Sequence, residues 1–194
     1  MTITALHQLP LALTMLRAAL GPVMVVLALV APSHTAFAVC LVLALLSDYF
    51  DGVIARRLGI ATEGLRRLDS VADSVFYLSA LFSAWYLHSD LLRQHLMPLG
   101  ALIALELIRY AFDYRKFGRE ASYHMWSSKL WGLTLFIGFF ALLVYGGGGW
   151  TVTLAIYTGF FADFEGLAIS FVLPKWQADI PTLFHAIRLR ASEA

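Results

Sequence analysis

The sequence predicts an all-α integral membrane protein with six transmembrane helices, forming a single domain over residues 1–194. Two features of composition support this prediction: 60% of the residues are hydrophobic, and only 14% are charged. An ordinary soluble domain is about 45–50% apolar and about 25% charged. The third feature is the length of the apolar stretches, which approach the roughly 20 residues that cross a bilayer. The net charge of +1 gives no indication of a nucleic-acid partner.

Six apolar stretches follow one another along the chain, and turn signals or charges separate them. The expected membrane helices cover residues 9–31, 35–54, 68–87, 96–112, 130–145 and 152–173. Pro10 suits the start of the first helix, and Pro32 suits its end. The four glycines at 146–149 are expected to separate the fifth helix from the sixth.

Basic residues gather in the loops on one side of this predicted arrangement. That side carries Arg56, Arg57, Arg66, Arg67, Arg115, Lys116, Arg119, Lys175, Arg188 and Arg190. The opposite loops offer Arg93 alone. Because cytoplasmic loops carry the excess of lysine and arginine, the basic side is expected to be cytoplasmic. Six spans then place both termini in the cytoplasm, and we expect the cell inner (plasma) membrane to be the membrane concerned.

Four aspartates lie at the cytoplasmic ends of the second and third expected helices. Asp48 and Asp51 are three residues apart, and Asp69 and Asp73 are four apart, so each pair shares a helix face. A hairpin of the two helices brings the faces together. Four carboxylates at one place repel one another unless they are protonated, paired with cations or bound to metal.

Two kinds of neighbour can neutralise these carboxylates. The first is structural: the nearby arginines at 56, 57, 66 and 67 pair with the aspartates and mark the inner surface. The second is functional, because oxygen ligands favour hard ions such as Mg²⁺, Mn²⁺ or Ca²⁺. Two carboxylates from each helix would suit a di-metal site on the cytoplasmic side. Such a pair of ions can hold the attacking and leaving oxygens of a phosphoryl displacement.

The residues around the four aspartates follow a defined spacing, with DYFDGVIAR at 48–56 and DSVAD at 69–73. This spacing resembles the signature of the CDP-alcohol phosphotransferase (CDP-alcohol phosphatidyltransferase) family, D-x2-D-G-x2-A-R-x8-G-x3-D-x3-D. Seven of its eight specified residues are present in 48–73. The eighth is a glycine in the family and Leu65 here. The spacing from Arg56 to Asp69 is unchanged, so we expect the metal ligands to be kept. Leu65 would narrow the nucleotide pocket or alter the donor preference, unless the loop shifts by one residue toward Gly64.

The resemblance implies a transferase of phospholipid biosynthesis. It would move a phosphatidyl or other substituted phosphate group from a CDP-alcohol, most often CDP-diacylglycerol, to a small alcohol acceptor, and release CMP. The implied cofactor is two Mg²⁺ ions, with Mn²⁺ as the alternative, held by Asp48, Asp51, Asp69 and Asp73. Asp73 would also be the catalytic general base. The implied CDP contacts come from Asp48, Gly52, Ala55 and Arg56. Relatives are often homodimers, so we expect a homodimer in the lipid bilayer.

Three basic residues outside the signature are candidates for further roles. Arg109 and Lys129 are candidate acceptor-binding residues, because charges within membrane helices are costly and so are usually functional. Arg109 could instead pair with Glu106 three residues earlier, and Lys129 could extend to the interface. Arg17 either takes part in an ion pair or lines the acceptor pocket.

Two alternative functions are consistent with acidic residues in a membrane chain. The first is a metal-binding member of the family that does not catalyse. The second is a small cation transporter, since intramembrane acidic residues also mark ion pathways. A transporter predicts carboxylates near the bilayer midplane and on several helices. The four aspartates of 48–73 are instead expected at one cytoplasmic edge, beside arginines that would repel a cation.

Overall fold

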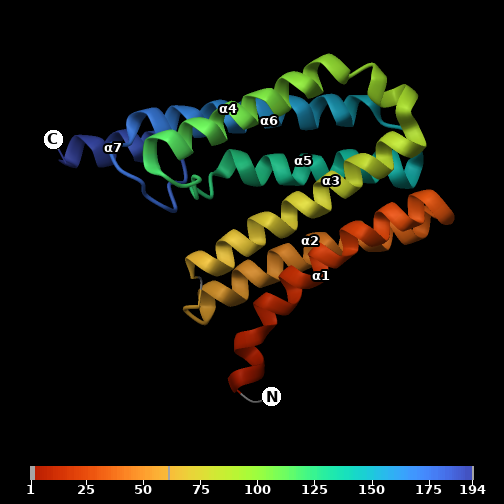
Figure 1. Ribbon diagram of the computed structural model, residues 1–194, viewed down its shortest axis with the longest axis horizontal. Helices are drawn as coiled ribbons and strands as arrows, with labels where there is room; N and C mark the ends of the chain where they lie inside the picture. The colour runs from red at the N-terminus through yellow and green to blue at the C-terminus, as the bar shows by residue number, and fades with distance from the viewer. Residues whose placement is uncertain (1–2, 61, 194) are drawn as a thin grey trace. The chain divides into compact units, whose positions relative to one another are not determined.

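The computed structural model describes residues 3–60 and 62–193, and every regular element within them is an α-helix (Figure 1). These residues form seven helices: α1 (Ile3–Val30), α2 (His34–Arg57), α3 (Glu63–Arg93), α4 (Leu96–Phe117), α5 (Trp126–Tyr145), α6 (Gly149–Val172) and α7 (Leu183–Glu193). The all-α prediction is confirmed for this part of the chain. All six expected helices are present as α1 to α6, and α7 adds a helix in what the sequence presents as a tail.

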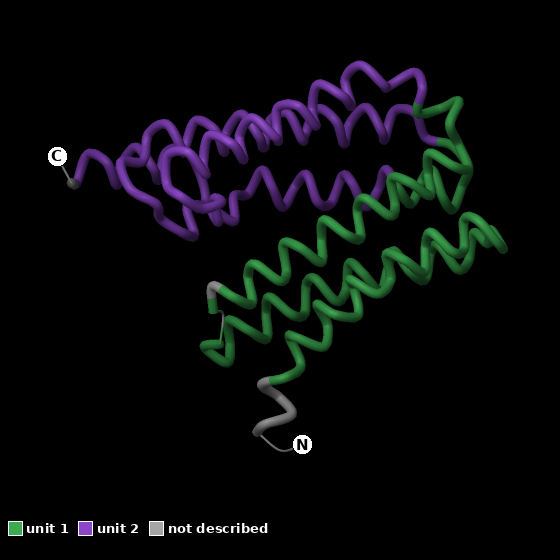
Figure 2. The backbone as a smooth tube through the Cα atoms, in the orientation of Figure 1, with its two compact units in different colours: residues 1–92, 139–147 green, residues 93–138, 148–194 purple. Residues whose placement is uncertain are grey.

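The chain divides into two compact units (Figure 2). Unit 1 contains residues 1–92 and 139–147, and unit 2 contains residues 93–138 and 148–194. Helix α5 therefore contributes residues to both units. The single domain over residues 1–194 stays a prediction, because two compact units can belong to one domain.

Four helices are long and apolar enough to cross a membrane: Gln8–Val30, His34–Arg57, Trp126–Tyr145 and Gly149–Val172. The helices expected at 68–87 and 96–112 are present as α3 and α4, but neither contains a stretch as apolar and as poor in charge as those of the four candidate spans. Charged residues interrupt both, such as Asp69 and Asp73 in α3 and Arg109 and Asp113 in α4. Four candidate spans support a membrane protein, and six spans stay a prediction.

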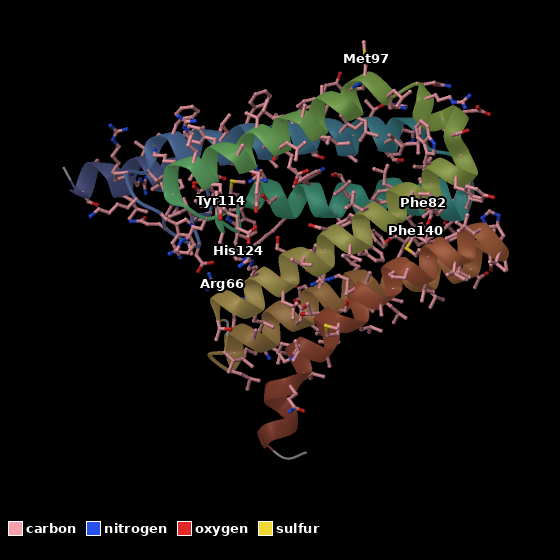
Figure 3. The ribbon with its side chains drawn as sticks, in the orientation of Figure 1. Arg66, Phe82, Met97, Tyr114, His124 and Phe140 are labelled. Carbon is pink, nitrogen blue, oxygen red and sulfur yellow. The ribbon has the colours of Figure 1, made fainter. Side chains whose placement is uncertain are left out.

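Large apolar side chains stand out from the helices of both units (Figure 3). Met97 at the start of α4 is 87% exposed, and Phe82 in α3 and Tyr114 in α4 are also exposed. Extended apolar surface is unusual on a monomeric soluble protein, whereas lipid hydrocarbon solvates it. The side-chain arrangement therefore agrees with the candidate spans.

Local signals set several helix ends. Ser33 caps α2, because its hydroxyl accepts a hydrogen bond from the N–H of residue 36 at 3.4 Å. The Thr62 hydroxyl accepts the N–H of Leu65 at 3.3 Å at the start of α3. Gly146 and Gly148 have φ of 67° and 106°, a left-handed conformation that glycine adopts without steric cost. The glycine run therefore separates α5 from α6 as expected.

The helices of unit 1 approach one another closely at a glycine. A Cβ added at Gly21 of α1 would lie 2.9 Å from Oγ of Ser79 and 3.2 Å from the carbonyl oxygen of Val75, both in α3. Small residues allow such close helix packing in membranes. The last part of α5 joins the same unit, where the Phe139 ring stacks on Tyr77 with centroids 6.2 Å apart. Figure 1 shows α1, α2 and α3 running side by side.

Unit 2 is built around the pairing of α4 with α6 (Figure 1). A Cβ at Gly159 of α6 would lie 2.8 Å from the side chains of both Leu102 and Trp131, so a larger residue there would force these side chains to move. Glu165 of α6 accepts the N–H of Leu183 at 3.1 Å and so fixes the start of α7. A small apolar core next to α7 contains Tyr123, Met125, Ile169, Leu173, Ile180 and Ala186.

The close approach at Gly21 predicts that Gly21→Val lowers the apparent melting temperature in detergent. Overpacking costs about 1–3 kcal/mol, and about 1 kcal/mol shifts the melting temperature of a chain of this length by roughly 2–4 °C. Gly100→Val is the matched control, because a Cβ at Gly100 of α4 meets nothing within 4 Å. Equal shifts in the two variants would show that Gly21 has no special packing role.

Candidate metal centre

Four carboxylates of unit 1 surround one guanidinium. Arg17 of α1 pairs with Asp48 and Asp51 of α2 and with Asp69 and Asp73 of α3. Nη2 of Arg17 lies 3.1 Å from Oδ2 of Asp51, and Nη1 lies 3.0 Å from Oδ1 of Asp73. Arg17 also donates hydrogen bonds to Asp48 and Asp69. Three helices therefore meet at one buried cation.

The helical period and a short connection place these carboxylates. Asp48 and Asp51 share one face of α2, and Asp69 and Asp73 share one face of α3. Only residues 58–62 separate α2 from α3, so the two helices form a tight hairpin. The structure thus brings together all four aspartates that the sequence singles out.

The cluster is closed on one side and open on the other. The side chain of Asp51 is only 6% exposed, whereas those of Asp69, Asp73 and Asp48 are 33%, 37% and 51% exposed. Asp51 also accepts a hydrogen bond of 3.2 Å from the hydroxyl of Thr14. Asp51 therefore forms the floor of the site, and the other three carboxylates remain accessible to a ligand.

Two residues of α1 belong to this cluster although they lie outside residues 48–73. Thr14 and Arg17 are three residues apart, share one helix face, and are each 1% exposed. The sequence did carry a signal for these two residues, because they are a polar and a charged residue inside an apolar helix. A charge in such a helix is costly unless it has a partner. The sequence alone left Arg17 open between an ion pair and the acceptor pocket, and the structure places it in ion pairs.

The carboxylates fit a hard metal ion. One oxygen each from Asp48, Asp51 and Asp69 can be chosen so that all three lie within 4.8 Å of one another. The donors are all oxygens, the set that Mg²⁺ and Ca²⁺ take. Asp73 contacts the same guanidinium and so lies beside this group. The number of ions and the choice between Mg²⁺ and Mn²⁺ stay predictions.

The residues expected to contact CDP follow the cluster along α2. Asp48, Gly52 and Arg56 are four residues apart and so lie along one strip of the helix. A Cβ at Gly52 would lie 3.2 Å from Nη1 of Arg56, so the Arg56 side chain folds back over the glycine. Ala55 is buried at 5% exposure within unit 1. Arg56 is thus exposed and covers Gly52, whereas Ala55 is buried among the helices of unit 1.

Leu65 lies in the first turns of α3 and lines an apolar groove of about 380 Å³. The lining residues of the groove, all in unit 1, are Leu11, Ile60, Thr62, Gly64, Leu65 and Leu68. A Cβ at Gly64 would meet nothing within 4 Å, so Gly64 is not required by packing. The side chain that replaces the expected glycine therefore fills space next to α1.

The candidate acceptor residues lie in unit 2, where both have contacts. Nε of Arg109 lies 2.9 Å from Oδ1 of Asp163, which is 1% exposed. A Cβ at Gly166 would lie 3.2 Å from the Arg109 side chain, so this glycine makes room for it. Lys129 is exposed, and its Nζ lies 4.4 Å from the centroid of the Trp126 ring, a cation–π contact. Asp163 is thus a partner of Arg109 that helical spacing did not reveal.

A second polar group in unit 2 joins α4, α6 and the segment between α4 and α5. The hydroxyls of Tyr123 and Ser170 lie 2.8 Å apart, and Nζ of Lys116 donates to the Ser170 carbonyl at 2.7 Å. Burial raises the pKa of Tyr123 to about 12, so its phenol stays protonated at neutral pH. These contacts connect the end of α4 to α6.

A family model matches most of the chain. The model described as CDP-alcohol phosphatidyltransferase matches residues 7–162, which include every aspartate of the cluster and Arg17. The chain belongs to the CDP-alcohol phosphatidyltransferase family. Comparison with curated proteins and with solved structures gave no significant match. As a family member the protein is a transferase of the CDP-alcohol type, and the family generally uses divalent metal ions, which the aspartate cluster could bind.

If the cluster holds the metal, Asp69→Asn weakens Mn²⁺ binding, measured by electron paramagnetic resonance of purified protein. Loss of one charged oxygen ligand is expected to lower affinity at least about tenfold, since even outer partners of ligands contribute 10–100-fold. Asp90→Asn makes the same change on the same helix, about 30 Å farther along. If both variants bind Mn²⁺ as the wild type does, the ion is held elsewhere.

Proposed function

We propose that this protein transfers a phosphatidyl group from CDP-diacylglycerol to a small alcohol, releasing CMP, as a step of phospholipid biosynthesis. The supporting observation is the convergence of Asp48, Asp51, Asp69 and Asp73 in a chain of this family. Four apolar helices suit a lipid donor, because its acyl chains can stay in the bilayer while its charged head group reaches the carboxylates.

In the proposed reaction the acceptor hydroxyl oxygen attacks the phosphorus that carries the lipid. A new P–O bond forms, the bond from this phosphorus to the bridging oxygen breaks, and CMP leaves with that oxygen and the electron pair. Asp73 accepts the hydroxyl proton as general base, a role open to it because its carboxylate is partly exposed. Bound divalent ions, held by the four aspartates, would neutralise the charge on the diphosphate.

The proposed donor contacts lie along α2 next to the cluster. Gly52 has no side chain, so the nucleotide can approach the backbone there when the Arg56 side chain, which lies over the glycine, turns to bind phosphate. Arg56 is exposed, and its planar guanidinium suits a phosphate oxygen pair. Ala55 would act through packing rather than contact, because it is buried. Asp48 is the most exposed of the four carboxylates and would face the nucleotide side.

The finer features of the proposal concern the membrane and the metal. We propose that the protein crosses the cell inner (plasma) membrane six times, with both termini in the cytoplasm. We also propose that it binds two Mg²⁺ or Mn²⁺ ions and forms a homodimer. The exposed apolar side chains of both units support contact with lipid or with a second copy of the chain. The side chains of Arg109 and Lys129 are proposed to bind the acceptor.

The test is CMP release by purified protein in detergent, with CDP-diacylglycerol, Mg²⁺ and a panel of acceptor alcohols. Asp73→Asn should lower turnover about 10²–10⁴-fold, which is the usual contribution of a general base. Asp90→Asn, at the far end of the same helix, should keep it. Chelation of the metal should stop release as well.

Failure of this test would separate the alternatives. Folded protein that binds Mn²⁺ but releases no CMP with any acceptor would indicate a metal-binding member of the family without catalysis. Passage of a divalent cation into proteoliposomes, without any CMP release, would indicate a transporter.

If Arg109 binds the acceptor, its substitution should change the KM for the acceptor and leave the KM for the donor almost unchanged. Arg109→Lys keeps the charge but loses the planar donor set, so the acceptor KM should rise about tenfold, as for one lost charge-assisted hydrogen bond. The donor KM should stay within about twofold. Arg115→Lys, exposed on the same helix, is the matched control. A rise in the donor KM, with no rise in the acceptor KM, would contradict the proposal that Arg109 binds the acceptor.

A further inference from the structure

Arg17 and divalent ions compete for the same oxygens. The guanidinium contacts all four aspartates, and three of these carboxylates supply the oxygens that lie within 4.8 Å of one another. A bound Mg²⁺ needs its oxygen ligands at about 2.1 Å in octahedral geometry. The Nη atoms of Arg17 lie against these same carboxylates, so an ion bound among them would meet the guanidinium as a like charge at short range.

The net charge of the cluster also opposes the binding of Arg17 and of metal ions at the same time. Four carboxylates and one guanidinium leave a formal excess of three negative charges. Two divalent ions would cancel the four carboxylate charges and leave the guanidinium, which is 1% exposed, without its counter-charge and close to two other cations. Like charges repel strongly at short distance in a poorly solvated site. The binding of metal therefore weakens the hold of the aspartates on Arg17.

One atom of Arg17 is left without a partner in its present position. Nε is buried and has no hydrogen-bond acceptor among the described residues. A buried charged donor without an acceptor is costly, so a position that satisfies it is favoured when one becomes available. The phosphate oxygens of a donor would provide such acceptors, because guanidinium binds phosphate through paired N–H groups.

We propose that Arg17 is an exchangeable counter-ion: it neutralises the four aspartates when no ion is bound, and divalent ions release it to bind the diphosphate of the donor. This inference rests on the proposed metal site and donor. It makes Arg17 a positioning residue that couples metal binding to donor binding. Because coupling is reciprocal, the donor also strengthens metal binding.

The experiment measures Mn²⁺ affinity of Arg17→Met by electron paramagnetic resonance, without any substrate. Removal of the competing cation should tighten Mn²⁺ binding about tenfold or more. A merely structural role of Arg17 would weaken or leave unchanged the same affinity. Arg57→Met is the matched control, since Arg57 is an exposed arginine in the last turn of α2 and its loss changes the net charge equally. The variant should also melt at a lower temperature in chelator and recover with Mn²⁺.

A second measurement uses the wild type and needs no variant. Mg²⁺ should increase the modification of Arg17 by an arginine-selective dicarbonyl reagent, followed by peptide mass mapping, and CDP with Mg²⁺ should suppress it again. Protection of Arg17 by Mg²⁺ alone would overturn the proposal, as would unchanged or weaker Mn²⁺ binding by Arg17→Met. If Arg17→Met does not fold, Arg17→Lys takes its place. Lysine makes fewer contacts with the carboxylates than arginine does, so this variant should bind Mn²⁺ a few-fold tighter than the wild type.

These outcomes separate the inference from the proposed function. A wild type that binds Mn²⁺ and releases CMP, with no tightening in Arg17→Met, contradicts the exchange of Arg17 alone. A wild type and an Arg17→Met variant that both fail to bind Mn²⁺ contradict the metal site and the exchange together.

Discussion

A buried guanidinium that must be neutralised holds the first three helices in place. Arg17 of α1 forms ion pairs with two carboxylates of α2 and two of α3, so one side chain connects α1 to both neighbouring helices. Loss of one partner of a buried ion pair typically costs about 3–5 kcal/mol, a large fraction of the stability of a domain. The arrangement is therefore mutual: the aspartates need a cation to stay together, and the cation needs the aspartates to stay buried.

The sequence predicted those parts of the structure that depend on local rules. Apolar stretches located α1 to α6, the glycine run located the break before α6, and helical spacing put Asp48 with Asp51 and Asp69 with Asp73. Two features were not foreseen because they depend on contacts between distant segments. The partner of Arg109 is Asp163, fifty-four positions later in α6. Helix α7 begins where Glu165 binds the N–H of Leu183, a contact that no local pattern encodes.

The candidate site was predictable to a similar degree. The signature gave the four aspartates and the neighbouring Gly52 and Arg56, since each lies on a face set by the helical period. It did not give the central place of Arg17, because the spacing within α1 does not say which helix packs against it. Nor did it give the burial of Ala55, since a small residue suits both ligand approach and helix packing. The residues proposed for the acceptor are already engaged, so an acceptor has to compete with Asp163 for Arg109.

Gly21 and Arg17 are four residues apart and lie on the same face of α1. The contact of Gly21 with α3 therefore fixes how far along its axis, and at what rotation, α1 presents its guanidinium. A slip of one residue would move the helix by about 1.5 Å and turn it by about 100°, which carries the charge away from the carboxylates. A glycine outside the signature thus sets the alignment of the site. A related chain with a bulkier residue at that position would have to supply the cation from another place.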